Sequence, residues 1–478
     1  MVAVHTDTAY ANAFLDLGTL GFDAGAHLLL KHALAACPAN MPLRVTGNAP
    51  GWQAQLAGWC RAQGHALQWH AGENMHAQDG EGGVGDNSVA SILKGSGETG
   101  RWRDAAHTGY ADPRTPGAVH AHAAPEWGLS ARGARVEAGA PAFAFRLSEK
   151  HEIWCDNAAE LYAQAVSAQW NPDTALDWNT PLTHSPEIEA AVRQVMTYMV
   201  ENENAALLVP ARFLGQIHPH YRELQAALAI QVADEARHIA VFMRRILLGG
   251  GEPALSTAGG QASLKSLLDE PDFSIASFLL SVLGEGTFVN LLQFLAAWAP
   301  DALTRQIGRL AARDEARHVA LGMSHLLERL QNEPTLRTRL AQAVERRHDH
   351  LAGTSGLNEE VFDALVLIAA GSLEPEAIRQ GFARVQQLTR EMADGRFSRL
   401  VRLGFARDEA ERLAALHTRN FMYARRAHDA ATARSPAKRR SSRPALRPRR
   451  RRAARPAWPG GTRRWRAGWR RAAASRPG

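Results

Sequence analysis

The sequence predicts a mainly α-helical protein: a four-helix bundle with extra helices, preceded by a small α/β module. Helical periodicity without strand alternation continues from about residue 185. Within it, proline, serine, aspartate and glycine mark the ends of four successive helices. The five residues Asp234–His238 also recur unchanged as Asp314–His318. On a helix, this pentapeptide places a glutamate and a histidine on one face, about one turn apart.

The composition is that of a soluble globular protein. The chain has 478 residues, the length of roughly three domains, with 45% hydrophobic and 22% charged residues. No apolar run approaches the ~20 residues of a membrane span, and the start lacks the pattern of a signal peptide. The three cysteines, Cys37, Cys60 and Cys155, are odd in number and widely spaced. They argue against a disulfide framework and for a cytoplasmic location.

The net charge of +7 is unevenly distributed along the chain. Residues 431–478 hold 17 Arg and Lys and no acidic residue, so subtracting those 17 from +7 leaves −10 for the rest. The tail has no periodicity and is predicted to be disordered. It would bind nucleic acid or an acidic surface only if it is a genuine part of the protein. A GC-rich reading frame read out of register past its stop gives the same composition.

Residues 1–72 form the expected α/β module. Helices are predicted over 24–36 and 52–63, and strands over 43–45 and 65–69. The module resembles the TusA-like sulfurtransferases at Leu15-Asp16, the helix after Gly21, Leu43–Val45, Trp59-Cys60 and Gly64–Leu67. That family's active Cys-Pro-x-Pro falls on Asp23–Ala26, which holds no thiol, so sulfur transfer is not carried over. Cys60 is interpreted as a packed helix cysteine.

Residues 73–148 lack periodicity and are predicted to be a flexible linker rich in glycine, alanine and histidine. Metal binding by its histidines is weighed against the more frequent case of solvated loop histidines, which is preferred. The histidines in or beside it are His70, His76, His107, His120 and His122.

Residues 149–430 form the expected helical domain. A helix is predicted over 152–169, and Trp170 and Trp178 are expected to pack against the bundle. The four bundle helices are predicted over 186–215, 219–249, 272–299 and 301–333. Few residues join the first to the second and the third to the fourth, whereas roughly 20 separate the second from the third. Two tight antiparallel pairs and one long crossover are the ferritin-like plan.

Further helices are predicted after the bundle, for example over 358–370 and 375–391. The run Glu345–His350 contains acidic residues and histidines that would suit a metal. A solvated polar face is the preferred interpretation of this run.

The repeated pentapeptide predicts a di-metal site. Four-helix di-metal proteins take Glu-x-x-His from two helices and one Glu from each of the other two. Each His needs an acceptor for its second ring nitrogen, and Asp234 and Asp314 suit that role across the helix pair. Arg237 and Arg317 can neutralise the buried acids. Salt bridges without a metal are the alternative, but burying both sets without a cation would be costly.

The two remaining carboxylates come from the first and third helices. In the apolar interior of the third helix, only Glu285 is available, and a lone carboxylate there needs a metal or a partner. The first helix offers Glu201 and Glu203. These two are two positions apart and cannot share one helix face.

The bundle resembles the hydroxylase α-subunits of bacterial multicomponent monooxygenases, within the wider ferritin-like di-iron superfamily. The matching motifs are Asn202–Ala206, Asp234–His238, Glu285–Asn290 and Asp314–His318. The resemblance favours Glu203 over Glu201. It implies two iron ions, with manganese–iron equally suited to the same donors. The implied metal ligands are Glu203, Glu235, His238, Glu285, Glu315 and His318.

Three positions depart from the pattern. The hydroxylases' active-site threonine is Val289 here, which puts a hydroxyl proton relay in doubt. Phe242 stands roughly where the ribonucleotide reductase subunit has its radical tyrosine, which argues against radical storage. Gln231 and Ala311 stand one turn before the two Glu-x-x-His steps, so an additional histidine ligand is not supported.

The resemblance implies a di-iron oxidase or monooxygenase that uses O₂ on a small organic substrate. Changes in the binding mode of the Glu203 and Glu285 carboxylates would accompany turnover, with the substrate near Phe288 and Val289. A separate reductase or ferredoxin would supply electrons, because no flavin or nicotinamide fingerprint is present. A homodimer and a ferritin-type ferroxidase without organic substrate stay open.

Overall fold

The computed structural model describes residues 13–38, 40–70, 88–95, 102–351 and 359–422. The predicted basic tail and His76 lie outside these residues. Within the described residues, three hydrophobic clusters are present, one in the N-terminal module and two in the helical domain.

The N-terminal module is a mixed four-stranded sheet with two helices. Its elements are β1 (Ala13–Asp16), α1 (Ala26–Ala36), β2 (Pro42–Thr46), α2 (Trp52–Gln63), β3 (Ala66–His70) and β4 (Val89–Leu93). The strand order is β1-β2-β4-β3, with β1 parallel to β2 and β4 antiparallel to both of its neighbours. Each helix buries one apolar face in the module's core, and Cys60 lies there at 1% exposure.

The structure differs from the expected linker in two places. β4 follows the predicted end of the module yet pairs with both β2 and β3, with Ala90 opposite Val45 and Trp69. Its five residues are too short a run to stand out in a Gly-rich surrounding. Residues 102–149 are also ordered, with β5 (Ala106–His107) paired to β6 (Arg135–Val136). Arg132 is buried there and pairs with Glu223 at 2.5 Å, which ties this segment to the bundle.

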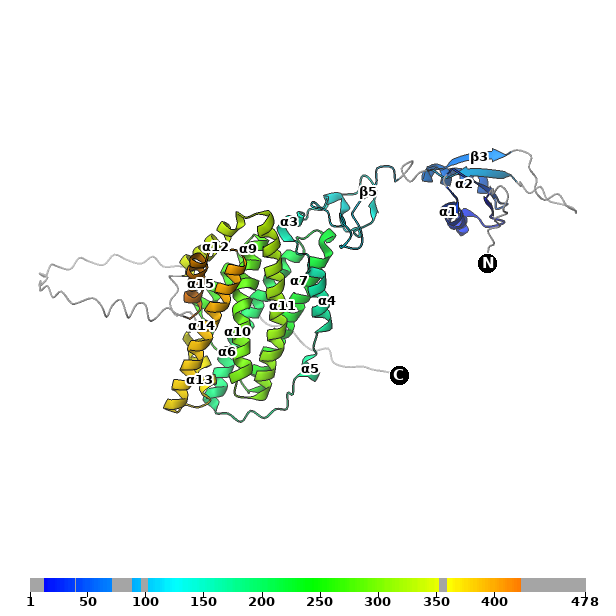
Figure 1. The fold of residues 1–478 in the computed structure, drawn as a ribbon. Helices are drawn as coiled ribbons and strands as arrows, with labels where there is room; N and C mark the ends of the chain where they lie inside the picture. Colours follow the sequence, from blue (N-terminus) through cyan, green and yellow to red (C-terminus); the bar gives the residue numbers. More distant parts are fainter. Residues whose placement is uncertain (1–12, 39, 71–87, 96–101, 352–358, 423–478) are drawn as a thin grey trace, which may run out of the picture. The chain divides into compact units, whose positions relative to one another are not determined.

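Four long helical segments among the described residues form the bundle (Figure 1). Ser185, Asp272 and Asp301 accept backbone hydrogen bonds at helix starts, as N-caps do. The first segment packs against the second, and the third against the fourth. Between the pairs, the long crossover contains α8 (Ala258–Leu268). The arrangement is that of the ferritin-like bundle. The segments are α6 (Pro186–Leu214), α7 (Arg222–Leu248), α9 (Phe273–Ser277) with η4 and α10, and α11 (Ala302–Asn332).

The third segment is not the single α-helix that the sequence predicts. After α9 it becomes an eight-residue π-helix, η4 (Phe278–Glu285), and continues as α10 (Gly286–Trp298). Arg399 donates from Nε to the η4 carbonyl of Val282 at 2.7 Å. A Cβ at Gly286 would lie 2.5 Å from the Arg399 guanidinium carbon, so glycine permits this close approach. π-Helical turns are rare and often occur at functional sites.

Shorter and later helices surround the bundle. α13 packs on α6, and α14 packs on α10 and α13. On another side, α4 contacts α7 and α11. The predicted helix over 152–169 is divided, because residues 154–157 break it. The surrounding helices are α3 (Lys150–Ile153), α4 (Ala158–Ser167), α5 (Pro172–Ala175), α12 (Leu336–Leu351), α13 (Glu359–Ala370), α14 (Pro375–Arg402) and α15 (Arg407–Met422).

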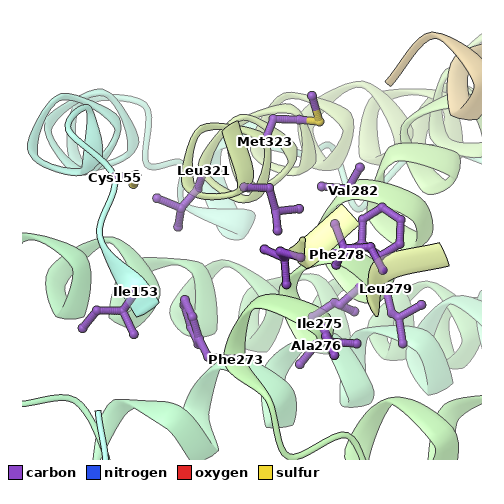
Figure 2. Close-up of a cluster of buried hydrophobic side chains, with 14 of the residues drawn as sticks. Ile153, Cys155, Phe273, Ile275, Ala276, Phe278, Leu279, Val282, Leu321 and Met323 are labelled. Atoms are coloured by element: carbon purple, nitrogen blue, oxygen red, sulfur yellow. The ribbon is translucent and has the colours of Figure 1, made fainter. Parts of the chain in front are cut away.

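A large hydrophobic core fills one end of the helical domain. Figure 2 shows Phe273 and Phe278 of the third segment with Leu321 and Met323 of α11 and with Cys155. Segment Phe273–Trp298 is apolar enough to resemble a membrane span, with a mean hydropathy of 1.6 over its most apolar window. However, 78% of that window is buried inside the protein, as in the core helix of a bundle. Its apolar sequence is therefore explained by packing.

Candidate metal centre

Six acidic and histidine side chains from four helical segments converge in the bundle. All six are between 0% and 4% exposed. They form two groups, in each of which the potential ligand atoms lie within 4.8 Å of one another. Glu235 and Glu315 belong to both groups. The first group is completed by Glu203 and His238, and the second by Glu285 and His318.

Of the two glutamates that the first helix offers as candidate ligands, only Glu203 faces the ligand cluster. Glu203 is 1% exposed and faces the other ligands, whereas Glu201 is half-buried and belongs to neither group. The difference follows from helical geometry, because positions two apart point about 200° away from each other around the axis. Whether the six side chains bind metal stays a prediction.

The two histidines present the same ring nitrogen to the carboxylates. Nδ1 of His238 lies 3.1 Å from Glu235, 3.5 Å from Glu315 and 3.6 Å from Glu203. Nδ1 of His318 lies 2.9 Å from Glu235 and 3.5 Å from Glu315. Nδ1 is therefore the nitrogen that each ring offers to a metal.

The opposite ring nitrogens reach across the helix pair. Nε2 of His238 lies 3.1 Å from Asp314 Oδ2, and Nε2 of His318 lies 3.4 Å from Asp234 Oδ2. Burial raises both Asp carboxyl pKa values, but the surrounding hydrogen bonds and charges together lower them below the ordinary value, and the largest of these contributions comes from the hydrogen bond of His318 to Asp234 and of His238 to Asp314. An ionised carboxylate only accepts, so each Nε2 carries a proton. Burial lowers the pKa values of His238 and His318, but the carboxylates around the rings raise them well above the ordinary value, so a metal that binds at Nδ1 would displace a proton from it.

Further polar side chains hold the two aspartates. Arg237 contacts both of them, at 2.5 Å from Asp234 and 2.8 Å from Asp314, and Arg317 also pairs with Asp314. Two residues that the sequence analysis did not assign to the site join this network. Nε2 of Gln169 donates to Asp234 at 2.7 Å, and Nε1 of Trp170 donates to Asp314 at 2.8 Å. No periodicity in the sequence distinguishes them from packing residues.

Gln231 has a role that the sequence did not reveal. It stands one turn before Glu235, and its Nε2 donates to Glu285 Oε1 at 3.0 Å.

Two aromatic residues lie near the ligands. Phe242, at the position of the reductase subunit's radical tyrosine, is buried beside His238, with ring centroids 6.2 Å apart. Tyr198 carries a buried phenol, and its ring centroid lies 5.9 Å from that of Phe288.

The pKa values of two of the carboxylate ligands, Glu203 and Glu285, are raised far above those of a solvated glutamate. Desolvation, followed by the charges of Glu235 and Glu315, raises the pKa of Glu203 well above its ordinary value. Desolvation and the charge of Glu315 raise the pKa of Glu285 in the same way. Bringing four carboxylates together in a dry interior is unfavourable, and protons or cations must offset their charge.

Two divalent cations fit this donor set. Among the described residues, nothing hydrogen-bonds to several buried ligand atoms, including both Glu315 oxygens, Glu203 Oε1 and Glu285 Oε2. Four carboxylates carry a charge of −4, which two divalent cations would neutralise with neutral histidines. Asp234 and Asp314 are already balanced by their two arginines. Carboxylate and imidazole donors in this number suit iron or manganese.

A pocket opens beside the centre. Glu203, Glu285 and Glu315 are among the residues that line it. Among the described residues, its wall includes Phe288 but not Val289, although both were predicted near the substrate.

No protein-family model and no curated protein matches the chain. Solved structures of low similarity include an R2-like ligand-binding oxidase variant with a Mn/Fe cofactor, at 15% identity over 55% of this chain and 94% of the other, with a TM-score of 0.36. A variant of that oxidase with a Fe/Fe cofactor also has 15% identity, over 55% and 93% of the chains, with a TM-score of 0.36. A Synechococcus protein with aldehyde deformylating oxidase activity has 17% identity over 50% and 99%, with a TM-score of 0.35. Values this low identify neither an activity nor a metal.

Proposed function

We propose that this protein is a di-iron or manganese–iron oxidoreductase that activates O₂ to oxidise a small organic substrate. The observation that carries the proposal is the pair of ligand groups sharing Glu235 and Glu315. Two groups with shared carboxylates hold two metals close together, as di-metal carboxylate proteins do. The bound metals would supply the redox chemistry with O₂.

The protein's own residues have distinct tasks in this proposal. Asp234 and Asp314 hold the histidine rings so that Nδ1 faces the metals. Glu203 and Glu285 each belong to one ligand group and also line the cavity, so they would hold the metals beside the substrate. The apolar walls keep water from the reacting substrate.

The reaction needs an external electron donor. Inserting one oxygen atom of O₂ into a C–H bond and reducing the other to water consumes two electrons and two protons beyond those of the substrate. A separate reductase or ferredoxin would deliver the electrons. The cavity favours an organic substrate over a ferroxidase that oxidises only iron, because ferroxidase turnover requires no apolar chamber.

The test is metal analysis of the purified full chain followed by rapid mixing of the Fe(II)-loaded protein with O₂. We expect two metals per chain and a transient optical absorption that is lost in Glu235→Ala. Fewer than two bound metals would contradict the proposal. Self-assembly into a shell that accumulates iron beyond two per chain would support the ferroxidase instead.

A further inference from the structure

The two ligand groups of the centre correspond to each other residue by residue. The repeated pentapeptide gives each group a histidine that follows a shared glutamate on the same helix. Each group also has one glutamate of its own, Glu203 from α6 and Glu285 from η4. Glu203 is therefore the counterpart of Glu285, and His238 is the counterpart of His318. A difference in chemistry at matching positions makes the two groups unequal.

The position four residues before each shared glutamate differs between the two groups. It holds Gln231 on α7 and Ala311 on α11, and both residues are almost fully buried. Nε2 of Gln231 donates to Glu285 Oε1 at 3.0 Å. The side chain of Ala311 is a methyl group, which can offer Glu203 no such hydrogen bond.

The position four residues before each unshared glutamate differs in the same sense. Ser281 stands four residues before Glu285, whereas Met199 stands four residues before Glu203. Desolvation and the charge of Glu315 raise the pKa of Glu285, and a hydrogen bond from Ser281 is among the contacts that lower it. Methionine has no hydroxyl to donate. Both differences therefore give Glu285 a neutral donor that its counterpart lacks at the matching position.

The two unshared glutamates are held differently as a result. Glu285 Oε1 accepts from Gln231, whereas Glu285 Oε2 has no hydrogen-bond partner among the described residues and is left for a metal. Glu203 Oε1 also has no hydrogen-bond partner there, and Nδ1 of His238, 3.6 Å away, is itself offered to the metals. A metal-bound carboxylate is ionised and only accepts hydrogen bonds. The Gln231 amide can therefore hold Glu285 in one orientation while a metal is bound.

We propose that Gln231 is a positioning residue that makes the two metal positions unequal. The group of Glu285 and His318 binds its metal more tightly and in one fixed arrangement, and the group of Glu203 and His238 holds the more exchangeable metal. The reason is that a ligand oriented in advance loses less conformational freedom when the metal binds. This inference rests on the metal binding of the proposed function but not on its reaction with O₂.

The test measures one ligand group at a time. Glu203→Ala leaves the four side chains of the Glu285 group, and Glu285→Ala leaves the four side chains of the Glu203 group. Mn(II) is titrated into each metal-free full chain, and unbound Mn(II) is measured by electron paramagnetic resonance. We expect the Glu203→Ala chain to bind one Mn(II) about tenfold or more tightly than the Glu285→Ala chain does.

Gln231→Met is then added to both chains, because it keeps the length of the side chain and removes the donor. In the Glu203→Ala chain it should weaken Mn(II) binding about 10–100-fold, since Glu285 loses the amide that orients it. In the Glu285→Ala chain it should change the affinity by less than about twofold, since its target is absent. A purely structural role of Gln231 would weaken both chains. Gln225→Met removes a glutamine of the same helix that binds only backbone carbonyls, and it should change neither affinity.

Two outcomes would overturn the inference. The first is equal Mn(II) affinity of the Glu203→Ala and Glu285→Ala chains, and the second is an equal effect of Gln231→Met in both. If circular dichroism shows that one of these chains does not fold, Gln231→Met is compared with the wild type. It should then weaken the tighter of the two stepwise Mn(II) affinities, and an unchanged pair of affinities would also overturn the inference.

The metal count and the reaction with O₂ distinguish this inference from the proposed function. Two metals in unequal groups, without an absorption change when the Fe(II)-loaded protein meets O₂, would refute the oxidoreductase and keep the role of Gln231. Two metals in equal groups, together with that absorption change, would refute only the role of Gln231. A wild-type chain that binds no metal would refute both.

Discussion

Removing different glutamates from the centre should leave different numbers of bound metals. Glu235 and Glu315 belong to both ligand groups, whereas Glu203 and Glu285 belong to one group each. Glu203→Ala therefore reduces the first group to three side chains and leaves the four of the second group intact. Glu235→Ala reduces both groups to three. We expect about one metal per chain in the first variant and almost none in the second.

The expected loss of metal affinity can be estimated from substitutions that leave the ligands themselves in place. Removing a residue that only orients a metal ligand lowers metal affinity about 10–100-fold. Losing a direct carboxylate ligand should cost at least about 100-fold, which is about 2.7 kcal/mol of binding free energy. At a metal concentration roughly tenfold above the wild-type Kd, a ligand group with all four side chains is then almost fully occupied, whereas a group that has lost one carboxylate is almost empty.

The assay is equilibrium dialysis against Mn(II) or anaerobic Fe(II), followed by elemental analysis, with circular dichroism to verify folding. Glu201→Ala is the matched control, because it removes a glutamate from the same helix two residues away and outside both groups. It should keep two metals. The reasoning would be refuted if Glu235→Ala retained one full-affinity metal, or if Glu203→Ala and Glu285→Ala each emptied the whole centre.

Further predictions concern the residues that support the centre and the bundle. Asp314→Asn should lower metal affinity at the His238 group about 10–100-fold in the same dialysis assay, because an amide can donate as well as accept and therefore no longer fixes the tautomer of the ring. Arg245→Met should lower the free energy of unfolding by about 3–5 kcal/mol in urea titrations, because Glu189 and Asp301 lose their buried partner. Burial raises the pKa values of these two acids, but Arg245, together with His184 at Glu189 and Thr304 at Asp301, lowers them below their ordinary values. Their stabilisation is therefore present above about pH 4 and is lost as the pH falls through the folded-state pKa values, so the difference between wild type and Arg245→Met should shrink in acid.

Much of the helical domain could be predicted because its helix ends have local causes. Ser185, Asp272 and Asp301 are caps, and a cap depends on a few neighbouring residues. The π-helix η4 could not be predicted in this way. It depends on contacts such as the hydrogen bond from Arg399, which is more than a hundred residues away in the chain.

In the N-terminal region, too, some of the structure depends on contacts between residues far apart in the chain and could not be predicted from local sequence. β4 has no clear pattern of its own, and it becomes a strand because β2 and β3 both pair with it. The ordered segment after it is held by the buried ion pair between Arg132 and Glu223. Long-range pairing of this kind has no local signal, so both segments were expected to be linker.

By itself, the sequence determined the two Glu-x-x-His steps, since their spacing is a property of one helix turn and does not depend on the rest of the fold. It also left Glu285 as the one candidate carboxylate ligand in the apolar interior of the third helix. The tertiary structure decided how these parts meet: which carboxylates are shared, which aspartate faces which histidine, and that Glu203 rather than Glu201 points inward. It alone brought Gln231 to Glu285, because contacts between helices far apart in the chain depend on packing and not on spacing.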